Sequence, residues 1–306
     1  MSEFAKELTL ALDIGGTKIA VALIDADGGI LRREQVPTPH GDAELVWAAV
    51  DGLIGAALTA AAGRRLRGVG VASAGPVDLL GGTVSPINII AWQGFPIVHR
   101  VADRSGLPVR LGGDGLCMAM GEWWRGAGRG ARFMLGMVVS TGIGGGLVLD
   151  GKPFHGRTGN AGHVGHVVVA PGGALCTCGG HGCVETVASG PQLARWAHDH
   201  GWDAPPEADA RDLADAAGRG DPVAVQAFAR GADAIAAAIA SAAAVCDLDL
   251  VVLGGGVASA GDVLFGPLRA ALDRYTGLAF LRGLRVVPAE LGGGAGLVGA
   301  AALWRS

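Results

Sequence analysis

Four residues with the chemistry of zinc ligands lie within eighteen positions of the chain: His166, Cys176, Cys178 and Cys183. Three thiolates and one imidazole complete a tetrahedral zinc shell, which leaves no open position for a reactive water. The spacing therefore predicts a structural zinc ion that braces a loop. The alternatives are a disulfide with a spare thiol, or buried apolar cysteines. The stretch from Met1 to Glu7 contains no basic-then-apolar leader, which favours a reducing, cytoplasmic location and hence the metal.

Three glycine-rich segments could hold phosphate, because backbone N–H groups without a neighbouring Cβ can approach an anion closely. Each one alone is explained equally well as a hairpin turn that requires positive φ. The P-loop motif and the correctly spaced dinucleotide fingerprint are both absent from the sequence. We therefore expect a two-lobed phosphate clamp built from matching hairpins. The three segments are Gly15-Gly16-Thr17-Lys18, Ser140-Thr141-Gly142-Ile143-Gly144-Gly145-Gly146 and Gly254-Gly255-Gly256.

Apolar periodicity predicts the elements that position these residues. Strand-rich hairpins are expected over 8–25 and 134–150, and their recurrence about 125 residues apart favours a duplicated α/β architecture. The remaining predictions are strands over 30–36, 68–73, 109–112 and 248–253, and helices over 43–62, 114–124, 191–198, 209–217, 222–246 and from about 294.

Composition limits the possible partners. The chain has 306 residues, of which 50% are hydrophobic, so a sizeable core and two domains are expected. A net charge of −4 without a basic block argues against nucleic acid. The longest apolar stretch, from Ala234 to Val245, is interpreted as too short and too weakly hydrophobic to span a membrane.

The glycine, cysteine and histidine motifs together resemble the ROK family of sugar kinases, over nearly the whole chain. The matching segments are Asp13-Ile-Gly-Gly-Thr-Lys18, Ser140 to Gly146, Gly162-His-Val-Gly-His166, Cys176 to Glu185 and Ala295 to Ala301. The resemblance implies a two-lobed actin/hexokinase-like (ribonuclease H-like) α/β fold with duplicated phosphate hairpins and a zinc loop. The first lobe would comprise 1–112 and the C-terminal helix 291–306, and the second lobe 113–290. Dimeric relatives imply a homodimer.

The resemblance also assigns roles in phosphoryl transfer, which requires positioned phosphates, magnesium and a carboxylate near the attacking oxygen. Asp114 would accept the proton of a sugar 6-hydroxyl, although an aspartate that opens a helix is often only its N-cap. Asp13 would organise Mg²⁺. The phosphates of ATP would be held by Gly15, Gly16, Thr17, Lys18, Ser140, Thr141, Gly142, Gly144 and Gly145, with Gly254, Gly255 and Gly256 near the adenosine. The sugar would contact Asn88, Asp114, His163, His166 and Glu185.

Two departures from the family pattern bear on the substrate. Gly113 stands where the family usually has asparagine, and His163 stands where glucokinase-like members have glutamate. A neutral imidazole can donate to an N-acyl carbonyl, so N-acetylmannosamine is favoured over glucose. Polyphosphate remains an alternative donor. A repressor of the same family would carry a DNA-binding domain before Leu8, and a sugar sensor would lack Asp13, Asp114 or the hairpins.

Overall fold

The computed structural model describes residues 7–305, which form two compact units. One unit contains the chain up to Gly130, the segment Gly146–Gly162 and the chain from Gly293 onward. The other contains Ala131–Gly145 and His163–Gly292. Residues 1–6, on which the expected absence of a leader partly rests, lie outside the described residues.

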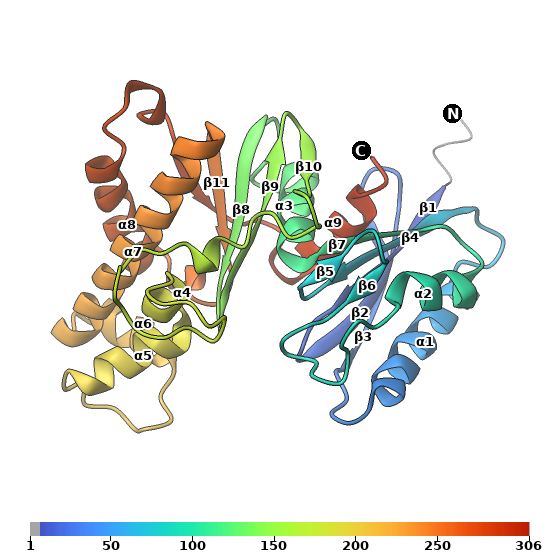
Figure 1. The fold of residues 1–306 in the computed structure, drawn as a ribbon, viewed down its shortest axis with the longest axis horizontal. Coiled ribbons are helices and arrows are strands. Elements are labelled where there is room, and N and C mark those ends of the chain that lie inside the picture. The colour runs from blue at the N-terminus through green and yellow to red at the C-terminus, as the bar shows by residue number, and fades with distance from the viewer. Residues whose placement is uncertain (1–6, 306) are drawn as a thin grey trace. The chain divides into compact units, whose positions relative to one another are not determined.

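The first unit is built on a five-stranded sheet with the order β3-β2-β1-β4-β7 (Figure 1). β1 (Leu8–Ile14) pairs antiparallel with β2 (Lys18–Ile24) and parallel with β4 (Leu66–Ser73). β3 (Ile30–Pro37) continues the hairpin on one side, and β7 (Val109–Gly113) pairs parallel with β4 on the other. The loops at the C-terminal ends of β1 and β7 therefore open on the same edge of the sheet, next to Asp13 and Asp114.

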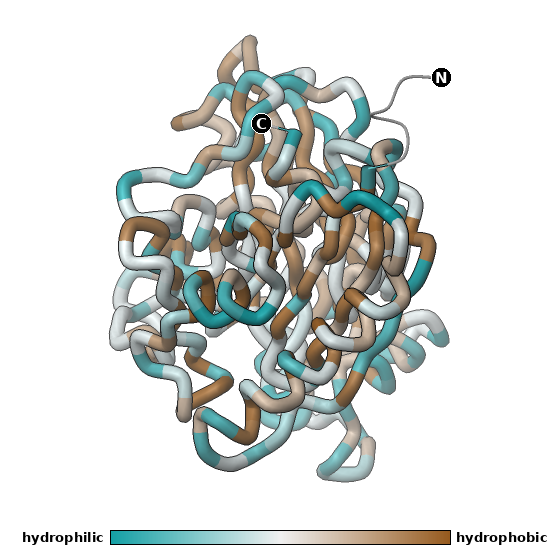
Figure 2. The backbone as a smooth tube through the Cα atoms, turned by 90° about the vertical axis from the view of Figure 1, so that its right-hand side faces the viewer, coloured by the Kyte–Doolittle hydropathy of each residue, from teal (hydrophilic) through white to brown (hydrophobic). Residues whose placement is uncertain are grey.

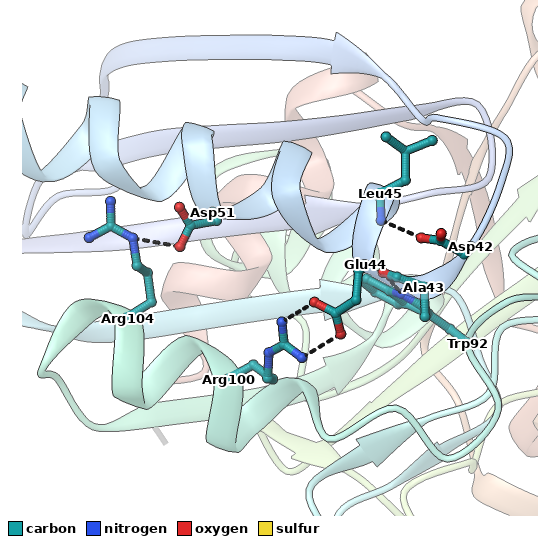
Figure 3. Close-up of polar contacts among 8 residues, drawn as sticks. All are labelled: Asp42, Ala43, Glu44, Leu45, Asp51, Trp92, Arg100 and Arg104. Atoms are coloured by element: carbon teal, nitrogen blue, oxygen red, sulfur yellow. Dashed lines mark hydrogen bonds and ion pairs between the residues drawn. The ribbon is translucent and has the colours of Figure 1, made fainter.

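Two helices cover one face of this sheet through a large apolar core. α1 (Ala43–Ala60) begins at Asp42, whose side chain caps the Leu45 N–H, and α2 (Ile97–Ser105) packs beside it. Figure 3 shows that Arg100 of α2 forms a two-point contact with Glu44 of α1, with N–O distances of 2.7 and 2.6 Å. An ion pair at the surface contributes little to stability, so the apolar core holds these helices on the sheet.

The opposite face of the same sheet is covered by α3 (Asp114–Arg125) and α9 (Ala295–Ala302). The two helices meet at glycines. A Cβ atom on Gly121 would lie 2.3 Å from the Ala295 carbonyl oxygen, and one on Gly299 would meet the Cys117 carbonyl oxygen at 1.5 Å. This close crossing holds the start of α3, and thus Asp114, against the C-terminal helix.

A second five-stranded sheet has the order β10-β9-β8-β11-β12. Its strands are β8 (Phe133–Val139), β9 (Ile143–Leu149), β10 (Lys152–Phe154), β11 (Leu250–Gly254) and β12 (Arg285–Pro288). β11 pairs parallel with both β8 and β12, as β4 does with β1 and β7. The two sheets therefore share one strand order, which confirms the predicted duplicated α/β architecture. A small hairpin of β5 (Val77–Asp78) and β6 (Thr83–Val84) is separate.

The second unit contains the longer helical region. Its helices are α4 (Glu185–Ala188), α5 (Gly190–Asp199), α6 (Ala210–Gly218), α7 (Pro222–Cys246) and α8 (Asp262–Tyr275), and α7 packs along α8 (Figure 1). By length and composition alone, α1 and α7 could each cross a membrane. The apolar stretch of α7 is thus longer than the sequence analysis allowed. Both helices bury apolar faces within their own units, as core helices do.

The division into units differs from the sequence-based expectation, and so does the set of elements. Residues 113–130 and 146–162 group with the first unit rather than the second, because α3 packs against α9. Helices α2 and α8 and strand β12 were not predicted. Figure 2, which colours the trace by hydropathy, shows apolar and hydrophilic stretches alternating along the chain.

Candidate functional site

The predicted zinc ligands come together. The ligand atoms of His166, Cys176, Cys178 and Cys183 all lie within 4.8 Å of one another. The Cys178–Cys183 Sγ distance and the Cys176 Sγ to His166 Nδ1 distance are both 3.7 Å. Tetrahedral zinc with Zn–S bonds of ~2.3 Å requires ligand atoms to stand roughly 3.7 Å apart. The cluster therefore fits zinc, and the two sulfurs are too far apart for a disulfide, whose bond is about 2.05 Å.

Tight turns shape the metal loop before any ion binds. The Cys176 N–H donates to the Gly180 carbonyl at 2.8 Å, and the Gly180 N–H donates to Cys178 Sγ at 3.4 Å, which lowers the pKa of the exposed Cys178 thiol. Burial raises the pKa of Cys183 to about 12. A bound zinc ion would offset this cost, because a coordinating thiol is deprotonated. Gly182 has φ +72°, and any Cβ there would collide with the Ala170 carbonyl oxygen.

The second glycine turn is shorter than predicted. The Ser140 N–H donates to the Gly142 carbonyl at 2.9 Å, and β9 begins at Ile143, so Gly144 and Gly145 lie in the strand rather than in the turn. No acceptor for the Thr141 and Gly142 N–H groups exists among residues 7–305. The turn thus has the free donors that an anion requires.

The third glycine segment packs on this turn. Gly254 ends β11, and a Cβ on Gly255 would lie 2.3 Å from the Val139 carbonyl oxygen, immediately before Ser140. Gly256 lies beside the Ser140 hydroxyl. Glycine at 255 is required here because its φ is +96° and because the two backbones touch.

A cavity of about 800 Å³ opens beside these two turns within the second unit. Its lining includes Thr141, Gly256, Pro191 and Ala194 of α5, and the guanidinium-bearing residues Arg195 and Arg211. This volume lies in the range of small-molecule and cofactor pockets. Sequence reasoning missed Arg195 and Arg211, because their relevance depends on α5 and α6 meeting at the turn.

The first glycine turn, between β1 and β2, has a similar supply of donors. The Gly15 N–H donates to the Lys18 carbonyl at 3.0 Å. Thr38, the residue after β3, holds the turn by donating its hydroxyl to the Gly15 carbonyl at 2.6 Å. The Gly16 and Thr17 N–H groups find no acceptor within the described part of the chain. Asn88 lies directly over Gly16, where a Cβ would contact its amide carbon at 2.6 Å.

Two carboxylates lie near this turn. Asp114 is the first residue of α3, and its Oδ1 accepts the Gly115 N–H at 2.7 Å. Asp13 is the next-to-last residue of β1 and lies against the start of α9, close to Gly296. The pKa of Asp13 is raised to about 6, chiefly by burial and next by the charge of Asp114, while Lys18 and Arg33 lower it. Two carboxylates this close to each other are typical of a cation site.

Lys18 and Arg33 extend the positive side of the first unit. The Lys18 ammonium and the Arg33 guanidinium both approach Gly293, just before α9. The sequence analysis did not identify Arg33 as a site residue. It belongs to β3, an edge strand with many charged residues, and such a pattern is typical of a solvent-exposed strand. The relevance of Arg33 follows only from the β2–β3 register, in which it lies opposite Ala22.

The remaining predicted residues lie in the second unit. His163 precedes a short 3₁₀ turn, Val164–His166, and its ring centroid is 6.4 Å from that of His166. Glu185 begins α4, and its Oε2 accepts the Ile143 N–H at 2.7 Å. The residues predicted around Glu185 thus form one continuous cluster with the second glycine turn.

Comparison with known proteins places this arrangement among characterised relatives. The glucokinase of Thermotoga maritima is 35% identical over 96% of this chain and 96% of its own length. The N-acetylmannosamine kinase of Yersinia pestis is 39% identical over 81% of this chain and 82% of its own. The solved structure of a Streptomyces griseus ROK family glucokinase with glucose and AMPPNP is 36% identical, covers 97% and 98% of the two chains and has a TM-score of 0.81. The ROK family pattern matches residues 9–306, and this chain belongs to the ROK family.

Proposed function

We propose that this ROK-type sugar kinase transfers the terminal phosphoryl group of ATP to the 6-hydroxyl of a hexose, with N-acetylmannosamine as the acceptor. The proposal rests on one observation: each of two glycine turns has backbone N–H groups without an acceptor among residues 7–305, and each lies next to groups that the reaction needs. One glycine turn has the carboxylates of Asp13 and Asp114 as neighbours. The other borders the 800 Å³ cavity.

Asp114 is proposed as the general base. Its carboxylate is fixed at the start of α3 by accepting the Gly115 N–H. From there it would accept the proton of the attacking hydroxyl, a role worth ~10²–10⁴ in rate. Asn88 and the zinc-loop residues His163, His166 and Glu185 are proposed to orient the sugar.

Asp13 is proposed to hold magnesium. The residues fit a hard cation, because a buried carboxylate with a raised pKa and a second carboxylate nearby is stabilised when a divalent ion neutralises them. When bound, the ion would neutralise charge on the donor phosphates. Lys18 and the Gly16 and Thr17 N–H groups would bind the phosphate oxygens.

A nucleoside donor is preferred over polyphosphate because of the cavity. Pro191, Ala194 and Val257 give the cavity an apolar wall against which a flat base and ribose would pack, whereas a phosphate chain would leave that wall exposed to water. The Ser140, Thr141 and Gly142 turn would bind the adjoining phosphates, and Gly254, Gly255 and Gly256 would border the adenosine.

N-acetylmannosamine is proposed because His163 replaces an anionic acceptor with a group that can donate to an N-acyl carbonyl. Space next to Gly113, where nothing lies within 4 Å of a built Cβ, leaves room for a larger sugar substituent. Glucose is the second candidate, favoured by the full-length similarity to the Thermotoga protein, which is named for that sugar.

The acceptor is tested by measuring kcat/KM for N-acetylmannosamine and for glucose in wild type and in His163→Glu. We expect wild type to prefer N-acetylmannosamine and His163→Glu to shift the ratio toward glucose by roughly tenfold or more, because the new carboxylate accepts from free hydroxyls. A wild-type preference for glucose would replace the proposed acceptor with the second candidate.

A further inference from the structure

Ile143, the residue that ends the second glycine turn, is held on both of its peptide groups by the zinc loop. Its N–H donates to Glu185 Oε2 at 2.7 Å. Its carbonyl oxygen lies so close to Gly165 that a Cβ there would approach it to 1.9 Å. Gly165 immediately precedes the ligand His166, and Glu185 follows the ligand Cys183 by two residues.

Glu185 contacts both the turn and the metal cluster. While Oε2 accepts from Ile143, Oε1 lies 3.9 Å from Cys176 Sγ. A Cβ on Gly142 would meet Oε2 at 2.8 Å, so the carboxylate also packs against the tip of the turn. One side chain therefore spans from a predicted zinc ligand to the backbone that is proposed to bind the donor phosphates.

We propose that Glu185 is a positioning residue that couples the occupancy of the zinc loop to nucleotide binding. The inference rests on the proposed function, because the assignment of the turn to the donor comes from there. His166, Cys176, Cys178 and Cys183 would hold the zinc ion and so fix the start of α4. The Glu185 carboxylate would then hold the peptide of Ile143, so that the Thr141 and Gly142 N–H groups stay directed at the phosphates. Losing zinc would then weaken nucleotide binding as well as sugar binding.

The contact is strong enough for the effect to be measurable. A hydrogen bond from a backbone N–H to a carboxylate changes an equilibrium by roughly tenfold or more when it is lost. It also leaves the Ile143 donor unpaired in a packed site, which favours a rearranged turn.

A double-mutant cycle tests the coupling, with the affinity for AMP-PNP and magnesium measured by calorimetry in the absence of sugar. The variants are Glu185→Ala, Cys178→Ala and the double variant; Cys178 is chosen because it is the exposed ligand. Zinc content is measured for each. We expect Cys178→Ala to lose zinc, each single variant to weaken nucleotide binding roughly tenfold, and the double variant to be no weaker than the worse single one.

Two further variants separate positioning from general disruption of α4. Glu185→Gln keeps a carbonyl acceptor for the Ile143 N–H and should recover most of the nucleotide affinity. Thr186→Val removes the Thr186 hydroxyl bond to the Cys183 carbonyl on the same helix without touching the turn, and should leave nucleotide affinity unchanged.

Three results would overturn the inference: unchanged AMP-PNP affinity in Glu185→Ala, losses that multiply to roughly hundredfold in the double variant, or no recovery in Glu185→Gln. Wild-type protein that does not bind AMP-PNP at all would overturn the proposed function, and the inference with it. If wild type and Glu185→Ala bind AMP-PNP equally well, the inference is overturned and the proposed function is not.

Discussion

At the scale of single residues, the sequence predicts best where residue type limits the chemistry. The cluster of His166, Cys176, Cys178 and Cys183 was predictable because three thiols and an imidazole at that spacing match the ligand set of structural zinc. Glu185 shows the limit. Its place after Cys183 could be read from the sequence, but its contact with Ile143 joins residues that are 42 positions apart and exists only once the zinc loop folds against β9.

The local sequence around Asp114 also does not determine the role of this residue. An aspartate that opens a helix fits both a cap and a base, but the N-cap of α3 is Gly113 and Asp114 is the first helical residue, whose Oδ1 accepts the neighbouring Gly115 N–H. The observation that bears on the second role is the charge of Asp114 acting on Asp13, a residue about one hundred positions away. Long-range pairing of this kind follows from the parallel β1–β4–β7 order and not from local pattern.

Asp13 should make stability depend on pH. Its pKa is raised from 3.8 to about 6, so the folded state binds the proton more tightly than the unfolded state and loses stability as pH rises through that window. The cost at neutral pH is roughly 3 kcal/mol, at ~1.4 kcal/mol per pH unit. Asp13→Asn should therefore increase the free energy of unfolding at neutral pH, although it should abolish most activity.

The measurement is denaturant unfolding of wild type and Asp13→Asn at several pH values, without nucleotide or magnesium. The difference should shrink as pH falls below about 6 and vanish below 3.8. A variant that is less stable at neutral pH, or a difference that does not change with pH, would contradict the assigned burial of this carboxylate.

At the scale of elements, the two hairpins were predictable because alternating branched residues flank glycine turns at both sites. α8 was missed because Gly266 and Pro267 stand inside it, and both residues disfavour a helix interior. Packing along α7 overrides that preference. The end of the second turn was misplaced because a run of glycines gives no local signal for where a strand begins.

The crossing of α3 and α9 gives a prediction at this scale. A Cβ on Gly299 would lie 1.5 Å from the Cys117 carbonyl oxygen, and neither backbone can move without disturbing the sheet beneath. Gly299→Ala should lower the free energy of unfolding by roughly 3 kcal/mol or more. Thermal or denaturant unfolding measures the loss.

Gly52→Ala is the matched control for Gly299→Ala. Gly52 is an exposed glycine inside α1, and a Cβ on it would meet no atom within 4 Å. The same substitution there should increase stability by up to about 1 kcal/mol through helix propensity. Equal effects at the two positions would show that the close crossing does not limit residue 299.

At the scale of the whole molecule, the shared strand order of the two sheets accounts for why two glycine turns occur. The sequence predicted that duplication, but it placed the division at residue 112, because a strand followed by a helix looks like a lobe boundary. The structure groups α3 with the first unit, since its partner α9 arrives from the end of the chain. Pairings between distant chain segments leave no periodic signal.

The duplication also separates the tasks of the reaction. The carboxylates Asp13 and Asp114 belong to one unit, and the cavity and zinc loop belong to the other. Catalysis in the proposed account is mainly positioning and charge stabilisation, with one proton removed from the acceptor. A kinase of this kind should form product only when both units carry their intact residues.

The most direct test of the central claim is ³¹P and ¹³C NMR of the product formed from ATP and N-acetylmannosamine, with Asp114→Asn as the comparison. The account predicts ADP and a phosphate ester on the 6-hydroxyl, with turnover in Asp114→Asn reduced at least ~10²-fold while the variant stays folded. Sugar-independent ADP release, a phosphate ester on another hydroxyl, or an Asp114→Asn variant that retains more than about a tenth of wild-type turnover would contradict it.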